Sequence, residues 1–403
     1  MTSPRLRVSA VRSSAGRDWL VVAACLACQI GMGAGGYIFP VFLKPVTDEL
    51  GWSRAQYAFA TPIMSTTVAL AGPLVGWVSD RRGPRWVLAV GSLLMSAALM
   101  RAGAIQTPDD LYLVGVAIGV AVACLGDLPT GAAVTARFRQ RRGLALGVVY
   151  IGSNIGGALV PLAGALLVAG ASWRTAFVVI GAALLVILPL ALSIGPAQTV
   201  ASEETDTGAW HAVARQRDFW LLFWVLFAFY FYRLGINTHL VAFLGDLGYS
   251  SLAAAGGFSL TLALGIVGKL ATGAIADRVG ARAAVLGNFS LIALASLLLL
   301  APMVGGALPL FLVVHGFATA AEDVVIPLVI AQRFGAAQLG RVYGLLLLAL
   351  VPGGWAGPLV AGWVFDVTGS YAPVFAAFAV TNLSAVAALA LVGRPTLRAR
   401  DLA

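Results

Sequence analysis

Long apolar runs separated by short polar loops repeat along the whole chain. Each run has about 20 or more residues, the length that an α-helix needs to cross the hydrocarbon core of a bilayer. Hydrophobic residues make up 60% of the chain and charged residues 11%, whereas soluble globular proteins carry roughly 25% charged residues. A soluble fold cannot cover so many apolar side chains with polar surface, so the sequence predicts an all-α membrane protein.

Twelve runs of this kind predict twelve transmembrane helices. Their approximate limits are 19–43, 55–78, 86–106, 111–136, 143–169, 173–194, 218–244, 250–276, 283–304, 308–332, 342–365 and 371–393. A polar segment, residues 195–217, separates the sixth run from the seventh and is typical of a linker. The sequence therefore predicts an N-terminal six-helix bundle in residues 1–194, a cytoplasmic linker, and a C-terminal six-helix bundle in residues 218–403.

Arginine and lysine are distributed unevenly between the loops. With the N-terminus inside, 20 of the 26 basic residues fall in inside segments, and only Lys44, Arg54 and Arg174 fall in outside loops. This bias predicts a multi-pass protein of the cell inner membrane with both termini in the cytoplasm. The net charge of +9 thus reflects topology, and we expect no nucleic-acid partner, because the charges do not gather on one face.

A loop motif occurs once in each half of the chain, after the second and the eighth run. The first copy consists of Gly76, Asp80, Arg81, Gly83 and Arg85. The second copy, 197 positions later, consists of Gly273, Asp277, Arg278, Gly280 and Arg282. The glycines would let helix ends approach, and the aspartates would pair with helix ends or arginines at an inside gate. A role in topology alone is the alternative.

The repeated G-x-x-x-D-R-x-G-x-R pattern resembles the loop motif of the major facilitator superfamily. Residues 37–40, 51–55, 141–147 and 173–177 resemble its branch of monocarboxylate porters and oxalate/formate exchangers. The resemblance implies two pseudo-symmetric six-helix bundles around a central cavity and a small organic anion as substrate. Spans 1, 4, 7 and 10 would line the cavity, spans 2, 5, 8 and 11 would form the bundle interface, and the other four would face lipid. We expect the protein to function as a monomer.

Cationic side chains inside the apolar runs are candidates for substrate binding. A charge at bilayer depth costs about 2.5 kcal/mol or more, so each one needs a cavity or a partner. The resembled branch carries a substrate-binding arginine where this chain has Lys269, and lysine still binds a carboxylate as a point charge. Gly235 would let the seventh helix unwind near Arg233. A structural pair with a carboxyl group is the alternative for both cations. The predicted substrate-binding residues are Lys269, Arg233, Asn237, Tyr37 and Tyr232.

Carboxyl and imidazole groups in the same runs are candidates for proton coupling. Glu322 and Asp323 lie about 100° apart around a helix and would face different neighbours. His315 lies seven residues before Glu322, on the same helical stripe, and either relays protons or satisfies a helix carbonyl. Asp127, the repeat counterpart of Asp323, either lines the path or is structural. His239, near the outer end of its run, suits a pH-sensitive gate or is a silent buried histidine.

Enzyme chemistry has no signature in the sequence. There is no nucleotide-binding G-x-x-x-x-G-K-[ST], no nucleophile–base constellation and no metal-ligand spacing, so we expect neither catalysis nor a cofactor. Cys25 and Cys28 form a lone CxxC, which favours helix packing over a redox site. The sequence predicts a secondary active transporter that carries out proton-coupled uptake or exchange of a small carboxylate. A drug/proton antiporter and a non-transporting membrane sensor are the alternatives.

Overall fold

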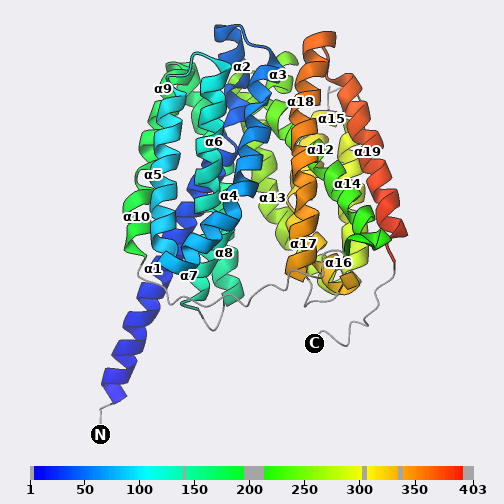
Figure 1. Cartoon of the computed structure of the whole chain (residues 1–403). Coiled ribbons are helices and arrows are strands. Elements are labelled where there is room, and N and C mark those ends of the chain that lie inside the picture. Colours follow the sequence, from blue (N-terminus) through cyan, green and yellow to red (C-terminus); the bar gives the residue numbers. More distant parts are fainter. Residues whose placement is uncertain (1–3, 139–141, 195–212, 302–305, 335–338, 394–403) are drawn as a thin grey trace. The chain divides into compact units, whose positions relative to one another are not determined.

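The computed structural model describes residues 4–138, 142–194, 213–301, 306–334 and 339–393. Every regular element in these ranges is a helix (Figure 1). Helices prevail because lipid offers backbone N–H and C=O groups no water, so each segment must satisfy them internally. Within the described ranges, eleven helices are long and apolar enough to cross a membrane, and a bent pair makes a twelfth. The predicted all-α fold with twelve spans is therefore confirmed.

The helices group into two compact units. Unit 1 comprises Met1–Ile38 and Thr66–Glu203, and unit 2 comprises Phe39–Ser65 and Glu204–Ala403. The segment 39–65, which contains the facing ends of the first two spans, thus groups with the second half of the chain. Most of the predicted linker, 195–217, lies outside the described residues, and the predicted bundle boundaries stay a prediction.

Unit 1 is built from the first six spans without their segment 39–65. Its helices are α1 (Pro4–Gly36), most of α4 (Ala60–Arg82), α5 (Pro84–Ala102), α6 (Pro108–Leu125), α7 (Asp127–Thr135), α8 (Arg142–Gly170), α9 (Trp173–Leu184) and α10 (Ile187–Ser193). Polar residues fix several starts: Thr107 and Ser172 accept hydrogen bonds from the first turns of α6 and α9. The apolar sequence therefore sets helix length, and the loop residues set where each helix begins.

Unit 2 adds the last six spans to the segment 39–65. Its helices are α2 (Phe39–Leu50), α3 (Arg54–Ala58), the start of α4, α12 (Arg217–Asp246), α13 (Ser251–Val279), α14 (Ala281–Leu298), α15 (Ala307–Thr319), α16 (Glu322–Phe334), α17 (Leu339–Leu346), η2 (Leu347–Ala349), α18 (Leu350–Thr368) and α19 (Ala372–Leu391). Because α12 ends at Asp246, we call that end of unit 2 the distal end. The opposite end, where α12 begins at Arg217, is the proximal end.

The loop motif has the same backbone geometry in both units. Gly83 has φ 83° and ψ 151°, and Gly280 has φ 86° and ψ 153°. A residue with a Cβ adopts such a φ only with strain, so both positions require glycine. Each glycine directly precedes a helix, α5 in unit 1 and α14 in unit 2. The sequence repeat therefore extends to the backbone.

Each unit contains helices that pack backbone against backbone. In unit 1, a Cβ built on Gly156 of α8 would lie 2.0 Å from the carbonyl oxygen of Ile30 on α1. In unit 2, a Cβ built on Gly357 of α18 would lie 2.2 Å from the carbonyl oxygen of Phe231 on α12. Only glycine permits such an approach, which is how membrane helices gain contact without a hydrophobic driving force.

Several of the predicted spans are interrupted, and three of the breaks concern the candidate site. These three breaks separate α1 from α2 at Tyr37, α6 from α7 at Gly126, and α15 from α16 at residues 320–321. The tenth span bends by 42°. The seventh span is continuous from Arg217 to Asp246, so the expectation that Gly235 unwinds it is wrong. Gly235 instead packs on α18, where its added Cβ would lie 3.1 Å from the carbonyl oxygen of Gly357.

Candidate functional site

Two of the broken spans place an acid at the start of their second half-helix. Asp127 opens α7 in unit 1, and Glu322 opens α16 in unit 2. A helix N-terminus carries partial positive charge and orphan N–H groups, which favour an anionic neighbour. Each half of the chain therefore has a broken span with an acid at the start of its second half-helix.

Asp127 is held by polar neighbours inside unit 1. Nε2 of Gln29, which is fully buried on α1, donates to Oδ1 of Asp127 at 2.8 Å and to Oγ1 of Thr130 at 3.0 Å. The hydroxyl of Tyr150 on α8 donates to the backbone carbonyl of Asp127 at 3.3 Å. Gln29 was not among the predicted residues, although a lone amide in an apolar run was the available signal. This cluster joins the first, fourth and fifth spans.

His315 is paired with Tyr232 in the interior of unit 2. The tyrosine hydroxyl and Nδ1 of the imidazole are 2.7 Å apart, and both residues are fully buried. Nδ1 therefore meets a hydroxyl rather than a helix carbonyl, the partner we had expected for a structural His315. The ring of Phe311 stacks on the imidazole, with 5.3 Å between centroids.

The break in the tenth span changes the expected relation between His315 and Glu322. Their spacing of seven residues places two side chains on one stripe only along a continuous helix. Because α15 ends at Thr319 and α16 begins at Glu322, no continuous stripe connects them, and that expectation is wrong. Glu322 itself is completely buried. The side chain of Asp323 lies outside the described residues.

The two predicted substrate cations lie on neighbouring helices of unit 2. Arg233 on α12 and Lys269 on α13 are both half-buried, and Asn237 is buried one helical turn beyond Arg233. The guanidinium carbon of Arg233 lies 5.6 Å from the centroid of the Phe229 ring. Tyr37 belongs to unit 1 and lies in the break between α1 and α2. Unit 2 thus contains four of the five predicted substrate residues.

The arginines of the loop motif make contacts within their own units. Arg282 donates to the carbonyl oxygens of Ala390 at 2.9 Å and Val392 at 2.5 Å, which cap the end of α19. Arg81 lies over the ring of Trp77, 4.3 Å from its centroid. Asp277 and Arg278 are exposed. The remaining aspartate, Asp80, has a side chain outside the described residues.

The proximal end of unit 2 also contains an ion pair. Arg333 at the end of α16 donates from Nε to Oδ2 of Asp218, in the first turn of α12. The same oxygen accepts the backbone N–H of Gly393 at 3.1 Å. These bonds connect the ends of the seventh, tenth and twelfth spans.

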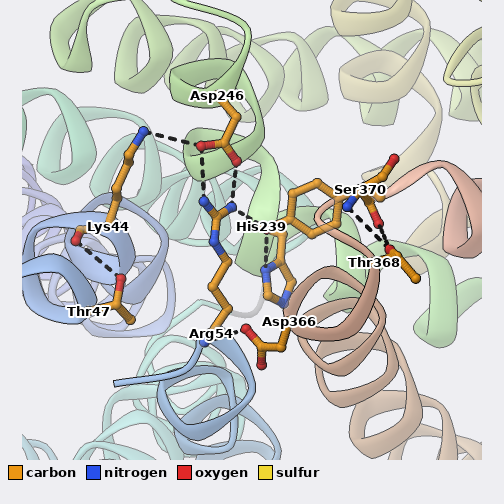
Figure 2. Close-up of polar contacts among 9 residues, drawn as sticks. Lys44, Thr47, Arg54, His239, Asp246, Asp366, Thr368 and Ser370 are labelled. Atoms are coloured by element: carbon orange, nitrogen blue, oxygen red, sulfur yellow. Dashed lines mark hydrogen bonds and ion pairs between the residues drawn. The ribbon is translucent and has the colours of Figure 1, made fainter. Parts of the chain in front are cut away.

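A cluster of charges at the distal end of unit 2 was largely missed from the sequence (Figure 2). We call it the distal cluster; it consists of Lys44, Arg54, His239, Asp246, Asp366 and Tyr371. Arg54 forms a bidentate ion pair with Asp246, at 2.6 Å from Nη1 and 2.9 Å from Nη2. Lys44 contacts the same carboxylate at 3.2 Å. The available signal was that Lys44 and Arg54 are rare basic residues outside the predicted inside loops.

Asp366 and two aromatic rings complete the seat of Arg54. The carboxylate of Asp366 accepts the backbone N–H groups of Arg54 and Ala55 at 3.0 Å each, at the start of α3. The guanidinium lies over the ring of Phe365, 3.7 Å from its centroid. It also donates to the hydroxyl of Tyr371 at 2.7 Å. The cluster thus connects α2 and α3 to α12, α18 and the start of α19.

Comparisons with known protein families agree with the helical membrane fold described above. Residues 25–314 match the family model described as Major Facilitator Superfamily. The chain belongs to the Major Facilitator Superfamily. It is similar to the probable sulfoacetate transporter SauU of Cupriavidus necator, at 26% identity over 85% of this chain and 86% of that protein. It is also similar to monocarboxylate transporter 13 of Rattus norvegicus, at 29% identity over 89% of this chain and 85% of that protein.

A solved structure shows the same superfamily fold. The nucleoside transporter NupG superposes with a TM-score of 0.77 at 16% identity, over 93% of this chain and all of that one. The family-model match and the similar transporters confirm the predicted membership in the superfamily and the resemblance to its monocarboxylate branch. This superfamily member is a multi-pass membrane protein whose relatives are transporters.

Proposed function

We propose that the chain is a secondary active transporter that moves a small carboxylate by alternating access, in proton-coupled uptake or in exchange. The observation that carries the proposal is a set of ionisable side chains inside membrane spans of unit 2. Arg233 and Lys269 are half-buried there, and Glu322 is completely buried. Ionisable groups at such positions are expensive and mark transport pathways. The names of the similar transporters, for sulfoacetate and for monocarboxylates, also point to organic anions.

In this proposal the two cations bind the anionic group of the substrate. Arg233 offers a planar fork for a carboxylate and Lys269 a point charge. Asn237, one turn from Arg233, and the hydroxyl groups of Tyr232 and Tyr37 would orient the rest of the molecule. Two cations in one site repel each other when the site is empty, so a bound anion stabilises them together.

The proton would be carried by an acid at a helix break. Glu322 is our first choice, because it is completely buried and opens α16. Asp323, its neighbour, and Asp127, at the matching break of the other unit, are the other proposed carriers. His315 would assist proton movement through its bond to Tyr232.

The proposed orientation puts the loop motifs and both termini on the cytoplasmic side of the inner membrane. The bias of arginine and lysine toward the predicted inside segments supports this orientation. The motif glycines Gly83 and Gly280 would fix the turns at the cytoplasmic gate. The distal end of unit 2 would then face the outside. We propose that a monomer in membrane lipid is the working unit.

Uptake into proteoliposomes tests the proposal. Purified protein is reconstituted and given radiolabelled lactate, pyruvate, acetate, oxalate or sulfoacetate, with and without an inward pH gradient. We expect at least one anion to enter, faster with the gradient or with a counter-anion inside. Lys269→Ala should lower its uptake by about tenfold or more, because a charge-assisted contact is worth about 1.5–3 kcal/mol.

Arg101→Ala is the matched control for loss of a basic side chain. Arg101 forms an exposed ion pair with Asp110 in unit 1. Uptake by the Arg101→Ala variant should therefore equal uptake by the unaltered protein. Failure of all five anions to enter under every gradient would refute the carboxylate proposal.

A further inference from the structure

The distal cluster contains a chain of hydrogen bonds whose direction is fixed by chemistry. It runs from Arg54 through the hydroxyl of Tyr371 to Nδ1 of His239, at 2.7 Å and 3.0 Å. It ends where Nε2 of His239 meets the backbone carbonyl of Pro358 at 2.9 Å. His239 and Tyr371 are both buried. All four residues belong to unit 2.

Each link allows only one assignment of protons. A guanidinium group has donors and no acceptor, so the oxygen of Tyr371 accepts from Arg54. The hydroxyl hydrogen of Tyr371 is then left for Nδ1 of His239, which must accept. A carbonyl oxygen only accepts, so Nε2 of His239 must carry a hydrogen toward Pro358. The closed cluster therefore holds His239 neutral, with its proton on Nε2.

The hydroxyl of Tyr371 keeps its hydrogen in this arrangement. Tyr371 lies between the last two spans, and burial raises the pKa of its phenol. The group therefore stays a donor to His239 throughout the physiological range. The state of the imidazole is thus connected to the position of Arg54 through a single oxygen atom.

A second proton on His239 conflicts with this arrangement. It can bind only at Nδ1, which would turn from acceptor into donor toward an oxygen that already accepts from Arg54. Two cations would then flank one hydroxyl at hydrogen-bond distance, which is unfavourable in a buried site.

Other charges around the imidazole do not remove the conflict. Asp366 on α18 favours a proton on His239, but its oxygens already bind two backbone N–H groups of α3. Asp246 on α12 is shared by Arg54 and by Lys44 of α2. Arg54 is therefore the group that a second proton on His239 displaces.

We propose that His239 is a proton-binding site. A second proton on its imidazole is incompatible with the closed distal cluster, in which Arg54 donates to Tyr371. A proton on Nδ1 displaces Arg54 from Tyr371, and release of Arg54 lets the imidazole take a proton. Because α2 and α3 hold the facing ends of the first two spans, displacement frees those ends from α12 and α18. The inference rests on the proposed proton coupling and names a second place, at the distal end, where a proton acts.

Proton binding to His239 and the bond from Arg54 to Tyr371 weaken each other, and this coupling can be measured without a transport assay. The chain has three histidines, His211, His239 and His315, so histidine-selective ¹⁵N labelling gives three pairs of imidazole signals, Nδ1 and Nε2 of each ring, in full-length protein in lipid nanodiscs. Replacing each histidine in turn by glutamine assigns them. We expect His239 to be the tautomer with its proton on Nε2 at pH 8. In Arg54→Gln it should titrate at least about one pH unit higher than in the unaltered protein, a tenfold gain in proton affinity.

Control variants separate this linkage from general damage. Arg54→Lys keeps the charge but loses the fork, so the titration should rise by less than in Arg54→Gln; it also serves if Arg54→Gln does not fold. In a Tyr371→Phe background, Arg54→Gln should have a smaller effect, because the shared oxygen is gone. Arg101→Gln should leave His239 unchanged, and His315 should not respond to Arg54.

Two results would overturn the inference. One is a proton on Nδ1 of His239 at pH 8, and the other is an equal titration of His239 with and without Arg54. Uptake by the same proteins decides the proposed function separately. If His239 responds to Arg54 while uptake ignores the pH gradient, the proton site stands and proton-coupled transport fails. If uptake follows the gradient while His239 ignores Arg54, transport coupling stands and the distal proton site fails.

Discussion

Two tyrosine–histidine pairs in unit 2 use the same contact in different surroundings. Tyr232 and His239 are seven residues apart on α12, so they lie on nearly the same face of the helix. Tyr232 meets Nδ1 of His315 at 2.7 Å, and His239 meets the hydroxyl of Tyr371 through its own Nδ1 at 3.0 Å. Both pairs are buried. We call Tyr232 and His315 the inner pair, and His239 and Tyr371 the outer pair. The inner pair packs against Phe311 and Phe378, whereas the outer pair is bonded to Arg54.

The difference shows how a neighbour changes what one contact can do. In the inner pair, either atom can be the donor, since imidazole and hydroxyl each carry both functions. In the outer pair, Arg54 removes that freedom, because it occupies the tyrosine oxygen as a donor. The outer pair is thus distinguished by the bond from Arg54 to its tyrosine oxygen, not by the tyrosine–histidine contact itself.

Removing Arg54 should give the largest effect, because it makes the outer pair resemble the inner one. Arg54→Ala removes the bidentate bond to Asp246, the bond to Tyr371 and the contact with Phe365. A fully buried ion pair loses roughly 3–5 kcal/mol when one partner is removed. The Arg54 and Asp246 side chains are 12% and 26% exposed, so we expect a loss of about 2 kcal/mol in the free energy of unfolding in detergent.

Arg101→Ala again provides the matched comparison. Its pair with Asp110 has a similar separation, 2.7 Å, but the Arg101 side chain is 53% exposed. The expected loss is far smaller than in Arg54→Ala, because solvent screens this pair. Equal losses for the two variants would show that the distal cluster adds no more than an ordinary surface pair.

Tyrosine-to-phenylalanine variants should give an intermediate effect and separate the two pairs. Each removes one hydroxyl from a buried imidazole and should cost about 1–2 kcal/mol of stability. Only Tyr371→Phe breaks a bond to Arg54, so only that variant should move the pH of half-maximal uptake, by about half a unit or more. Tyr232→Phe leaves the bonds among Arg54, Tyr371 and His239 intact, so any shift of that pH should be smaller than in Tyr371→Phe. Equal shifts in both variants would erase the distinction between the pairs.

The features that the sequence predicted correctly are local ones. Apolar runs define spans because bilayer thickness sets helix length, and Gly83 and Gly280 share one turn geometry because the motif repeats. The bonds between distant positions were not predictable in this way. Gln29 and Asp127 are 98 residues apart, and Arg54 and Asp246 are 192 apart. Such pairs depend on tertiary packing, which no period in the sequence reports.

The error about His315 and Glu322 has a different origin. Helical periodicity assumes a continuous helix, and two alanines and a threonine at residues 319–321 give no sign of a break. The break at Gly126 does carry a sign, because glycine is a weak helix former. The repeat aligns Gly126 with Glu322 and Asp127 with Asp323. Both halves therefore have a break and an acid there, but the second half lacks the glycine that would indicate a break in the sequence.

Replacing Lys44 should give the smallest effect, and it tests whether surface charge alone governs the outer pair. Its side chain is 40% exposed and lies 3.2 Å from Asp246, which Arg54 already binds with two bonds. Lys44→Gln should therefore lower the free energy of unfolding by less than about 0.5 kcal/mol, and the loss should vanish in about 1 M salt, where the Debye length is about 3 Å. The loss in Arg54→Ala should persist at the same salt, because that guanidinium is shielded from ions by Phe365 and Tyr371. If both losses disappear together, the outer pair is governed by surface charge, and the bonds from Arg54 to Tyr371 and on to His239 do not set its behaviour.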